Sequence, residues 1–349
     1  MEIIKAQTTD QLKWNNFVRD NYPPVGAFMQ TWEWGEFKKN LGIKVERYVI
    51  KNKGEMIALF TLVEQKLPLK FTYGYLPRGP VIHKSHQSAT ELASILKNIR
   101  AWVIKSYPHF LFLRLEPPIM TLKIDVWQKD FYKPSYYVQP RYNEIIRLDK
   151  EEGEILAGFH PNTRSNIKRA EKRAVTSRVV DFTTDKIHDD FCLMTNDIVE
   201  RNHGQHIYPG KDYFVNFLKT IPKAGDQNDK SELSLITLYG YCHGEPAAIY
   251  LALLFGDTMT YLYGASLTTY LNSKVTTYLH WQAMREAKRR GHKYYDLGAV
   301  DEKLWPTLTQ FKRQFKGQEF TYVGNIDIPL NPYLYQIYNL AQWFKRIRY

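Results

Sequence analysis

The fold is decided by a stretch that begins Arg47-Tyr48-Val49-Ile50-Lys51, turns at Gly54-Glu55 and returns as the apolar run Met56 to Glu64. An aromatic strand, a helix and a strand ending in an acid follow: Phe71 to Leu76, Ala89 to Lys105 and Leu111 to Glu116. Direct strand-to-strand turns combined with a helix between strands indicate an α/β domain with a mixed sheet.

The same order of elements returns around a second turn, Gly244-Glu245. The elements of the second copy are Leu233 to Tyr241, Pro246 to Phe255, Thr260 to Ala265, Thr276 to Arg290 and Lys293 to Asp296. The offset of about 180 to 190 residues is far too long for a solenoid repeat. We therefore expect two copies of one domain with a cleft between them.

Composition agrees with two folded domains, because 349 residues are many for one core and 44% of them are hydrophobic. Cys192 and Cys242 lack the spacing of a metal site and cannot build a disulfide framework, which favours a reduced, cytoplasmic protein. The first residues hold no apolar signal core. The longest apolar run, Ala247 to Phe255, is well short of the ~20 residues that span a bilayer.

The formal net charge of +12 favours polyanionic partners. Such partners include nucleic acid, anionic lipid and phosphorylated small molecules. Many basic enzymes bind none of these tightly, so the charge alone does not select among them.

Further elements divide the chain into a first domain, residues 1–149 completed by 325–349, and a second domain, residues 150–324. In the first domain Thr31 is placed to cap a helix from Trp32 to Asn40. The other elements expected from the pattern are the helices Asp10 to Arg19, Gly153 to Ala174 (in two pieces separated at Pro161), Asp190 to His203, Thr307 to Lys316 and Pro332 to Arg348, with strands Asn143 to Leu148 and Thr321 to Ile326. Order and length fit two tandem domains of the GCN5-related N-acyltransferase (GNAT) fold, with mixed sheets.

A basic helix follows Pro161. Arg164, Lys168 and Lys172 recur at i, i+4 and i+8 and line one face, while Arg169 and Arg173 form a second row. A solvated face normally mixes signs of charge, and here five bases surround one acid. The density favours contact with phosphates or a tRNA backbone, and the alternative is an ordinary exposed face of a basic protein.

Two further cations stand at places suited to chemistry. Arg78, in Pro77-Arg78-Gly79-Pro80, follows a strand end and could clamp phosphate, or it could simply pair with a neighbouring acid. Lys312 lies beside the apolar face that Phe311 and Phe315 make at i, i+4. An ammonium directed into a cleft from there could stabilise an oxyanion, although spacing alone favours a surface lysine.

The strand-end acids Glu116 and Asp296 could accept a proton from an amine nucleophile, or could form structural salt bridges. The sequence lacks the turn of the form Arg/Gln-x-x-Gly-x-Gly/Ala that holds the pyrophosphate of acyl-CoA. It also lacks a phosphate-binding P-loop, a Gly-x-Ser-x-Gly elbow and a Cys/His metal cluster. We expect neither metal nor cofactor, and an acyl donor other than acyl-CoA.

Six segments in register resemble the Fem family (FemA, FemB and FemX), whose members build peptidoglycan side-chain bridges without the ribosome. The segments are Gln30 to Lys39, Pro77-Arg78-Gly79-Pro80, Thr163 to Lys172, Tyr263-Gly264-Ala265-Ser266, Tyr295-Asp296-Leu297-Gly298 and Phe311-Lys312-x-x-Phe315. The resemblance implies two GNAT-like domains and an aminoacyltransferase. It also implies an aminoacyl-tRNA donor and a muropeptide acceptor, either UDP-MurNAc-pentapeptide or its lipid-linked form, lipid II.

The resemblance also implies roles for single residues. Lys312, with Phe311 beside it, matches the lysine that stabilises the tetrahedral intermediate, and Lys38 aligns near a lysine that holds the diphosphate. The acceptor side is implied to include Arg78, Tyr75, Tyr213 and Tyr263. Glu116 stands at the position of a proposed base, where the FemX-type pattern has Asp. Tyr208 falls near the position at which the FemX-type pattern has a diphosphate-binding arginine. This departure disfavours binding of the soluble UDP-linked precursor and leaves the lipid-linked precursor open.

Only Pro222 to Glu232 is available for the helical arm of staphylococcal members, so the chain resembles a compact form, which we expect to be a monomer. The final helix is expected to bury one face, made of Leu334, Ile337, Tyr338, Ala341 and Phe344. Docking on the first domain is favoured over a membrane-surface anchor. We expect a cytoplasmic protein and leave open a peripheral position at the inner membrane face. Two alternatives remain: an N-acyltransferase with another acceptor, and a tRNA- or RNA-binding protein with a decayed site.

Overall fold

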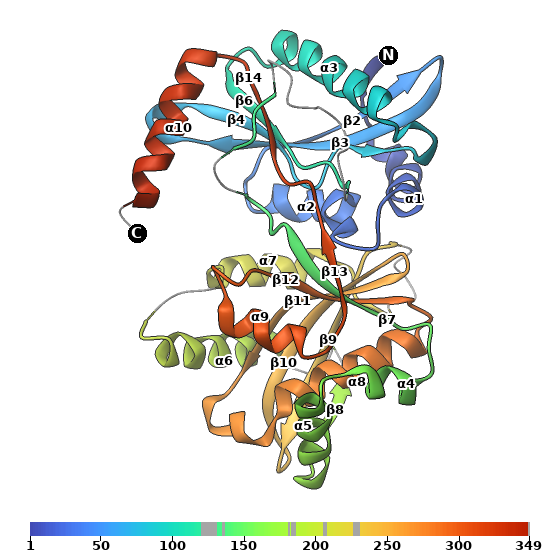
Figure 1. Cartoon of the computed structure of the whole chain (residues 1–349), viewed down its shortest axis with the longest axis vertical. Helices are drawn as coiled ribbons and strands as arrows, with labels where there is room; N and C mark the ends of the chain where they lie inside the picture. Colours follow the sequence, from blue (N-terminus) through green and yellow to red (C-terminus); the bar gives the residue numbers. More distant parts are fainter. Residues whose placement is uncertain are drawn as a thin grey trace. The chain divides into compact units, whose positions relative to one another are not determined.

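The computed structural model describes residues 1–119, 131–134, 137–180, 182, 186–204, 208–225 and 231–347, with side chains up to residue 342. The chain forms two compact units: unit 1 is Met1–Arg141 with Thr321–Tyr349, and unit 2 is Tyr142–Phe320. The boundary lies before Tyr142 rather than after residue 149, because the strand that starts there pairs within the sheet of unit 2. Each unit is a mixed α/β domain (Figure 1).

The sheet of unit 1 is antiparallel up to β4, and the helix α3 (Ala89–Ser106) then carries the chain to a strand parallel to β4. The last neighbour, β14, pairs antiparallel with β6 and comes from the C-terminal segment. The strands lie in the order β1 (Glu2–Lys5), β2 (Val45–Asn52), β3 (Glu55–Lys66), β4 (Thr72–Leu76), β6 (Phe110–Leu115) and β14 (Ile326–Pro329), and β5 (Val81–Ile82) pairs with β3.

The sheet of unit 2 repeats this plan, as the sequence repeat predicts. Three antiparallel strands are followed by α8 (Val275–Arg289) and then by a parallel strand. The strands lie in the order β13 (Gln318–Thr321), β7 (Tyr142–Arg147), β12 (Tyr294–Val300), β11 (Thr258–Ser266), β10 (Glu245–Phe255), β9 (Ser234–Cys242) and β8 (Thr176–Val179). Here β7, which precedes the repeat in the chain, takes the place that β14 has in unit 1.

Helices cover both faces of each sheet. In unit 1, α3 packs an apolar stripe that includes Leu92, Ile95 and Ile99 against one face, and α2 and α10 lie on the other (Figure 1). The remaining helices are α1 (Gln11–Asn21), α2 (Trp32–Asn40) and α10 (Pro332–Ile347) in unit 1, and α4 (Glu152–Gly158), α5 (Pro161–Lys172), α6 (Ile187–Arg201), α7 (Lys211–Thr220) and α9 (Pro306–Arg313) in unit 2. In the part of the chain that the structure describes, no helix is long and apolar enough to cross a membrane.

The elements differ from the sequence-based expectation in several places. A single strand from Thr321 to Ile326 is wrong, because β13 ends at Thr321 and β14 begins at Ile326, where the chain passes from one sheet to the other. The helix α7 and the strand β8 are not predicted by the pattern. The segment from Pro222 to Glu232 lies partly outside the described residues.

The predicted buried face of α10 is also wrong in part. Ile337 is 63% exposed and Ala341 is exposed, whereas Tyr335 and Tyr338 are buried. The hydroxyl of Tyr335 donates to Asp327 Oδ2 over 2.7 Å, and this bond fixes the rotation of the helix. The side chain of Phe344 lies outside the described residues.

Candidate active site

A cavity of about 200 Å³ lies between α2 and the sheet of unit 1. Lys38 and Trp34 line it from α2, Gln65 from β3 and Tyr75 from β4. The Lys38 ammonium lies 5.0 Å from the centre of the Trp34 ring, and burial lowers its pKa to about 8. A half-buried ammonium in such a cavity is suited to bind an anion, because low polarity strengthens its electrostatic attraction.

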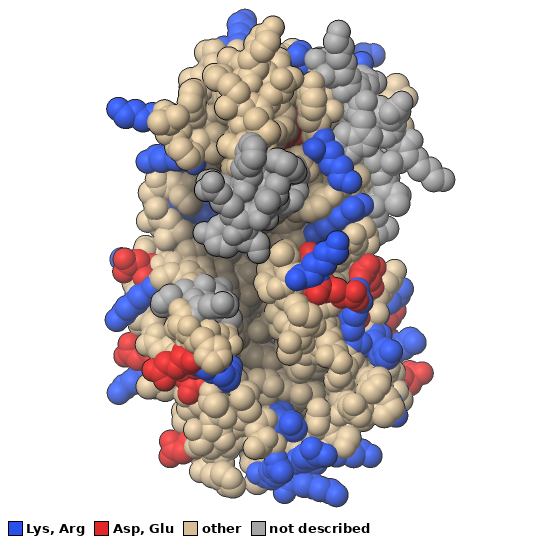
Figure 2. Space-filling model, turned by 60° about the vertical axis from the view of Figure 1, so that its left-hand side comes forward, with Lys and Arg blue, Asp and Glu red and all other residues tan. Residues whose placement is uncertain are grey.

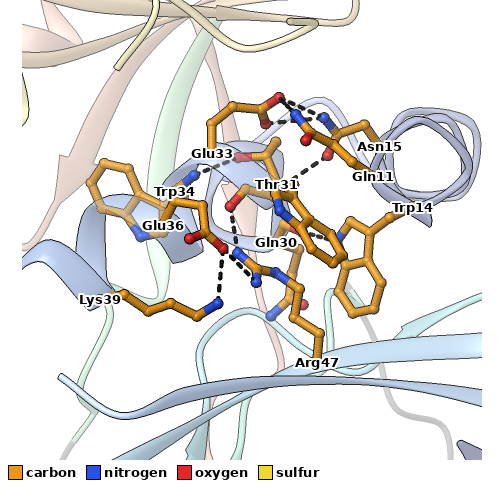
Figure 3. A network of polar contacts seen from close by, with 11 residues as sticks. Gln11, Trp14, Asn15, Gln30, Thr31, Glu33, Trp34, Glu36, Lys39 and Arg47 are labelled. Carbon is orange, nitrogen blue, oxygen red and sulfur yellow. Dashed lines mark hydrogen bonds and ion pairs between the residues drawn. The ribbon is translucent and has the colours of Figure 1, made fainter. Parts of the chain in front are cut away.

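A buried polar network holds the N-terminal end of α2 (Figure 3). Thr31 caps the helix by accepting from the Trp34 amide over 3.3 Å. The carboxylate of Glu33 accepts from Asn15 Nδ2 at 2.9 Å, and Asn15 Oδ1 in turn accepts from the Trp32 amide at 2.9 Å. These contacts fix α2 against α1, and therefore help to position Lys38 in the last turn of the helix.

Arg47 of β2 packs against the same helix. Its guanidinium lies 3.9 Å from the centre of the Trp32 ring and forms a 2.8 Å ion pair with Glu36 (Figure 3). A Cβ atom at position 35 would lie 2.3 Å from Arg47 Nη2, so any larger residue there would displace the guanidinium from these contacts. Several residues of the segment from Gln30 to Lys39 thus cap α2 or pack it against α1 and β2.

Arg78 and Glu116 meet in a buried network at the end of β4. The Arg78 guanidinium lies 4.0 Å from the centre of the Tyr322 ring and donates to Pro140 O at 2.6 Å. Both oxygens of Glu116 are hydrogen-bonded: Oε2 accepts from Tyr75 Oη at 2.7 Å and from the Arg78 amide at 3.2 Å, and Oε1 accepts from the Gln139 amide at 3.1 Å. Burial raises the pKa of Glu116, and the nearby Arg78 opposes that rise.

These contacts favour the structural interpretation of both residues. The amide of Asn325 also faces Glu116 when its nitrogen is oriented toward Oε1, 2.7 Å away. We therefore propose that Glu116 holds the Pro77–Pro80 turn in place and does not accept the proton of the amine.

Glu116→Gln is expected to lower the free energy of unfolding by about 1–3 kcal/mol, because an amide nitrogen would face backbone donors. The activity of the folded protein should stay within about tenfold of wild type, since general base catalysis typically contributes 10²–10⁴-fold. Denaturant titration and single-turnover rates, corrected for the folded fraction, measure the two effects. A hundredfold lower rate in a fully folded variant would restore the role of base.

Lys312 lies where β11 and β12 separate in unit 2. These strands pair only from Thr258–Tyr294 to Thr260–Asp296 and then take other courses. Lys312 is buried, its Nζ donates to Ala299 O at 2.8 Å, and it lies 5.8 Å from the centre of the Tyr261 ring. Burial lowers the pKa of Lys312 to about 8, although Asp296 opposes this.

Asp296 is fully buried and shapes the bend that holds Lys312. Its carboxylate accepts from the Gly298 amide at 2.7 Å and from Asn143 Nδ2 at 3.2 Å. Gly298 has a φ of +79°, a conformation that favours glycine. The bend directs Ala299 O toward the ammonium, so the geometry favours a positioning role for Asp296.

His280, a buried residue of α8 next to this lysine, carries no signal in the sequence that marks it as part of the site. Its Nδ1 lies 2.9 Å from Tyr295 Oη, and its ring lies 4.7 Å from that of Tyr261 and 5.5 Å from that of Phe311. Burial holds the pKa of His280 well below its usual value, and Lys312 adds to this shift. A neutral histidine therefore forms part of the wall beneath Lys312.

Tyr213 and Tyr263, singled out for the acceptor, do lie together. Their hydroxyls are 2.8 Å apart, and the Tyr263 ring packs edge-on against Phe214 of α7. Tyr208 joins them, because its hydroxyl donates to Gly264 O. Among the described residues, no group of three His, Cys, Asp or Glu side chains is placed to hold a metal ion.

The basic helix is α5, which buries Thr163, Ile167 and Ala170. Its bases Lys168, Arg169 and Lys172 are exposed, and so is Arg173 at the C-cap. Figure 2 shows lysine and arginine side chains gathered at the lower end of the face that it draws, at the level of α5 in Figure 1. Arg164 is only partly exposed and donates to Ala157 O at 3.0 Å and to Phe159 O at the end of α4. Arg173 also donates to a backbone carbonyl, Asn272 O.

Known proteins resemble this chain both in sequence and in structure. A lipid II:glycine glycyltransferase of Staphylococcus aureus (strain MRSA252) is 28% identical over 231 residues, which cover 64% of this chain and 52% of the relative. The chain thus spans about half the length of the curated relatives it matches. The crystal structure of FemX superposes with a TM-score of 0.77 at 20% identity, over 97% of this chain and 100% of FemX. A tandem GNAT protein from the clavulanic acid biosynthesis pathway superposes with a TM-score of 0.56 at 8% identity, over 95% of this chain and 99% of that protein.

The two superpositions establish the fold as two GNAT-like domains. The model of the FemAB family matches residues 9–135 and 234–343, which together are more than half of the chain. The matched ranges include Lys38, Arg78 and Glu116 in unit 1, and Asp296 and Lys312 in unit 2. The chain belongs to the FemAB family.

Proposed function

We propose that the protein transfers an amino acid from aminoacyl-tRNA to the stem-peptide amine of a peptidoglycan precursor. The observation that carries this proposal is the buried Lys312 ammonium at the separation of β11 and β12. The amine attacks the ester carbonyl, a C–N bond forms, the ester C–O bond breaks, and the tRNA hydroxyl leaves with the proton that the amine loses. Lys312 stabilises the oxyanion of the tetrahedral intermediate. The contacts around it argue against a decayed site.

The donor is held by the exposed bases of α5. Lys168, Arg169, Lys172 and Arg173 present positive charge along one helix, which suits a run of backbone phosphates. Arg164 contributes indirectly, by joining the end of α4 to α5. The ester of the donor is already activated, so the reaction needs no nucleotide hydrolysis, and the protein acts as a monomer without a cofactor.

The acceptor is held through its diphosphate by Lys38, in the cavity that Trp34 and Tyr75 also line. Tyr213 and Tyr263 contact the peptide. The named relative acts on lipid II, which supports a lipid-linked acceptor, and the soluble UDP-linked form is the second candidate. A lipid-linked acceptor would bring the protein to the inner face of the membrane.

The proposal is tested by mixing the protein with radiolabelled Gly-, Ala- or Ser-tRNA and with each precursor in turn. Transfer should add label and the mass of one amino-acid residue to one of the precursors, and the preferred tRNA identifies the amino acid. Lys312→Met serves as the inactive control. If neither precursor gains label, and if wild type and control behave alike, the proposed function is wrong.

Lys168→Glu combined with Lys172→Glu is expected to weaken binding of aminoacyl-tRNA. The slope of log K against log salt should become shallower by about 2, because two phosphate contacts are lost. Filter binding over a series of salt concentrations measures this slope.

The matched control is Lys97→Glu with Lys105→Glu, which makes the same change of charge on exposed positions of α3. The control should bind tRNA as the wild type does. Equal weakening in both pairs would show that net charge, and not α5, attracts the tRNA.

A further inference from the structure

One side of α10 exposes an apolar stripe. Tyr333 is 82% exposed, Ile337 63% and Leu340 55%, and their spacing of i, i+4 and i+7 places them on one face of the helix. The opposite side buries Tyr335 and Tyr338 against the sheet of unit 1. The helix is therefore docked by one face and presents a second apolar face to solvent.

The turn between β3 and β4 presents another exposed apolar residue. Leu69 at its tip is 88% exposed, and Phe71 beside it is also exposed. Leu69 has a φ of +59° and Lys70 a φ of +62°, a left-handed conformation that is unfavourable for residues with a Cβ atom. Glycine or asparagine would adopt this backbone conformation with less strain. The leucine therefore costs free energy both through its backbone conformation and through its solvent-exposed apolar side chain.

These two features belong to one edge of unit 1. Leu67, just before the turn, and Leu334 of α10 both pack against the cluster that contains Tyr73 and Phe112. Figure 1 accordingly shows α10 lying across the end of the sheet where β3 and β4 turn. The apolar stripe and the tip of the turn thus form one surface, which we call the α10 surface (Leu69, Phe71, Tyr333, Ile337 and Leu340).

The charged residues of the two segments that form the α10 surface are all basic. Lys66 and Lys70 flank the turn, and the sequence of α10 includes Lys345 and Arg346 near its end. Neither residues 66–76 nor residues 332–347 contain an aspartate or a glutamate. Apolar side chains flanked by basic ones suit the boundary of a bilayer that contains anionic lipids.

We propose that the α10 surface docks on an anionic membrane. Its apolar side chains enter the region between headgroups and acyl chains, while the lysines contact lipid phosphates. This rests in part on the proposed function, since a lipid-linked acceptor keeps its diphosphate at the membrane surface. Tyr73, under α10, and Tyr75, which lines the Lys38 cavity, lie on the same face of β4 about 7 Å apart. Docking would bring that cavity close to the lipid-linked diphosphate.

The test is co-sedimentation of the full chain with vesicles of phosphatidylcholine alone or mixed with phosphatidylglycerol. The wild type should bind the anionic vesicles, more weakly at high salt, and Ile337→Gln with Leu340→Gln should lower the affinity at least about tenfold. Leu69→Gln should weaken binding further. All three residues are exposed, so the unfolding midpoint should remain that of the wild type.

The matched control is Leu12→Gln with Leu193→Gln, two leucines about as exposed on α1 and α6, which should bind vesicles as the wild type does. The proposal is overturned if the wild type ignores anionic vesicles or if the α10 variant binds as tightly. Sedimentation velocity tests whether a second copy of the chain occupies the surface instead. If the wild type forms a dimer that the α10 variant does not form, and neither binds vesicles, the surface is an interface between copies.

The vesicle assay contains no tRNA or acceptor, so a negative result there is separate from a failure of amino-acid transfer.

Discussion

Replacing Lys312 by methionine is expected to lower kcat for amino-acid transfer by about 10²- to 10³-fold, the usual effect of removing one oxyanion donor. The loss should fall on kcat and on kcat/KM alike, because the ammonium acts on charge that develops only in the transition state. Methionine fills a similar volume among the buried neighbours of Lys312, so the fold should persist. Single-turnover transfer from labelled aminoacyl-tRNA measures the effect.

Lys316→Met, in an exposed lysine just beyond α9, is the matched control and should transfer at the wild-type rate. The pH profile gives a second readout. Burial lowers the pKa of Lys312 to about 8, so the cation is present below that pH and is lost above it. The rate of Lys312→Arg, which stays charged, relative to the rate of the wild type should therefore rise above about pH 8, since the ionisation of the attacking amine is the same in both. A Lys312→Met variant that transfers normally would contradict the proposed mechanism.

Asp327→Ala is expected to lower the stability of unit 1 by about 3–5 kcal/mol, because it leaves the buried charge of Arg114 without its counter-ion. Arg114 and Asp327 are both fully buried and form two hydrogen bonds of 2.7 Å. Tyr335 of α10 donates to the same carboxylate at 2.7 Å. The substitution should therefore loosen β14 and α10 together.

Hydrogen exchange of the β6 and β14 amides measures this effect within unit 1, which avoids the assumption that a two-domain chain unfolds in one step. Arg114→Met with Asp327→Leu should recover much of the stability, since apolar side chains replace both charges. Asp20→Ala, which breaks an exposed pair with Arg19, should change stability by less than about 1 kcal/mol. Equal losses for Asp20→Ala and Asp327→Ala would show that burial of the ion pair is unimportant.

Much of the fold was predictable because its signals are local. The Gly54 and Gly244 turns and the helix between strands in each copy are recorded in short stretches of sequence. The cap at Thr31 and the break at Pro161 are equally local, and both were correctly placed. The exposed bases of α5 likewise follow from helical spacing alone.

The candidate site was predictable only as a set of residue types. Lys312 and Asp296 stood out at the ends of recognisable elements, but His280 looked like any histidine of an amphipathic helix. Spacing along the chain leaves open whether Arg78 faces a ligand or the Tyr322 ring, since Tyr322 is remote in sequence. The tertiary structure shows which of these side chains are buried and which groups they contact, and these contacts decide the role proposed for each.

The sequence by itself determined the doubled plan, the order of elements within each copy and the basic character of α5. Tertiary structure alone decided which strand completes each sheet: β14 from the C-terminal segment beside β6, and β7 from before the second copy beside β12. It also paired Arg114 with Asp327, 213 residues apart, and thereby set which face of α10 is exposed. The physical reason is range: turns and helices form from neighbouring residues, whereas strand partners and buried charges are selected by contacts between distant ones.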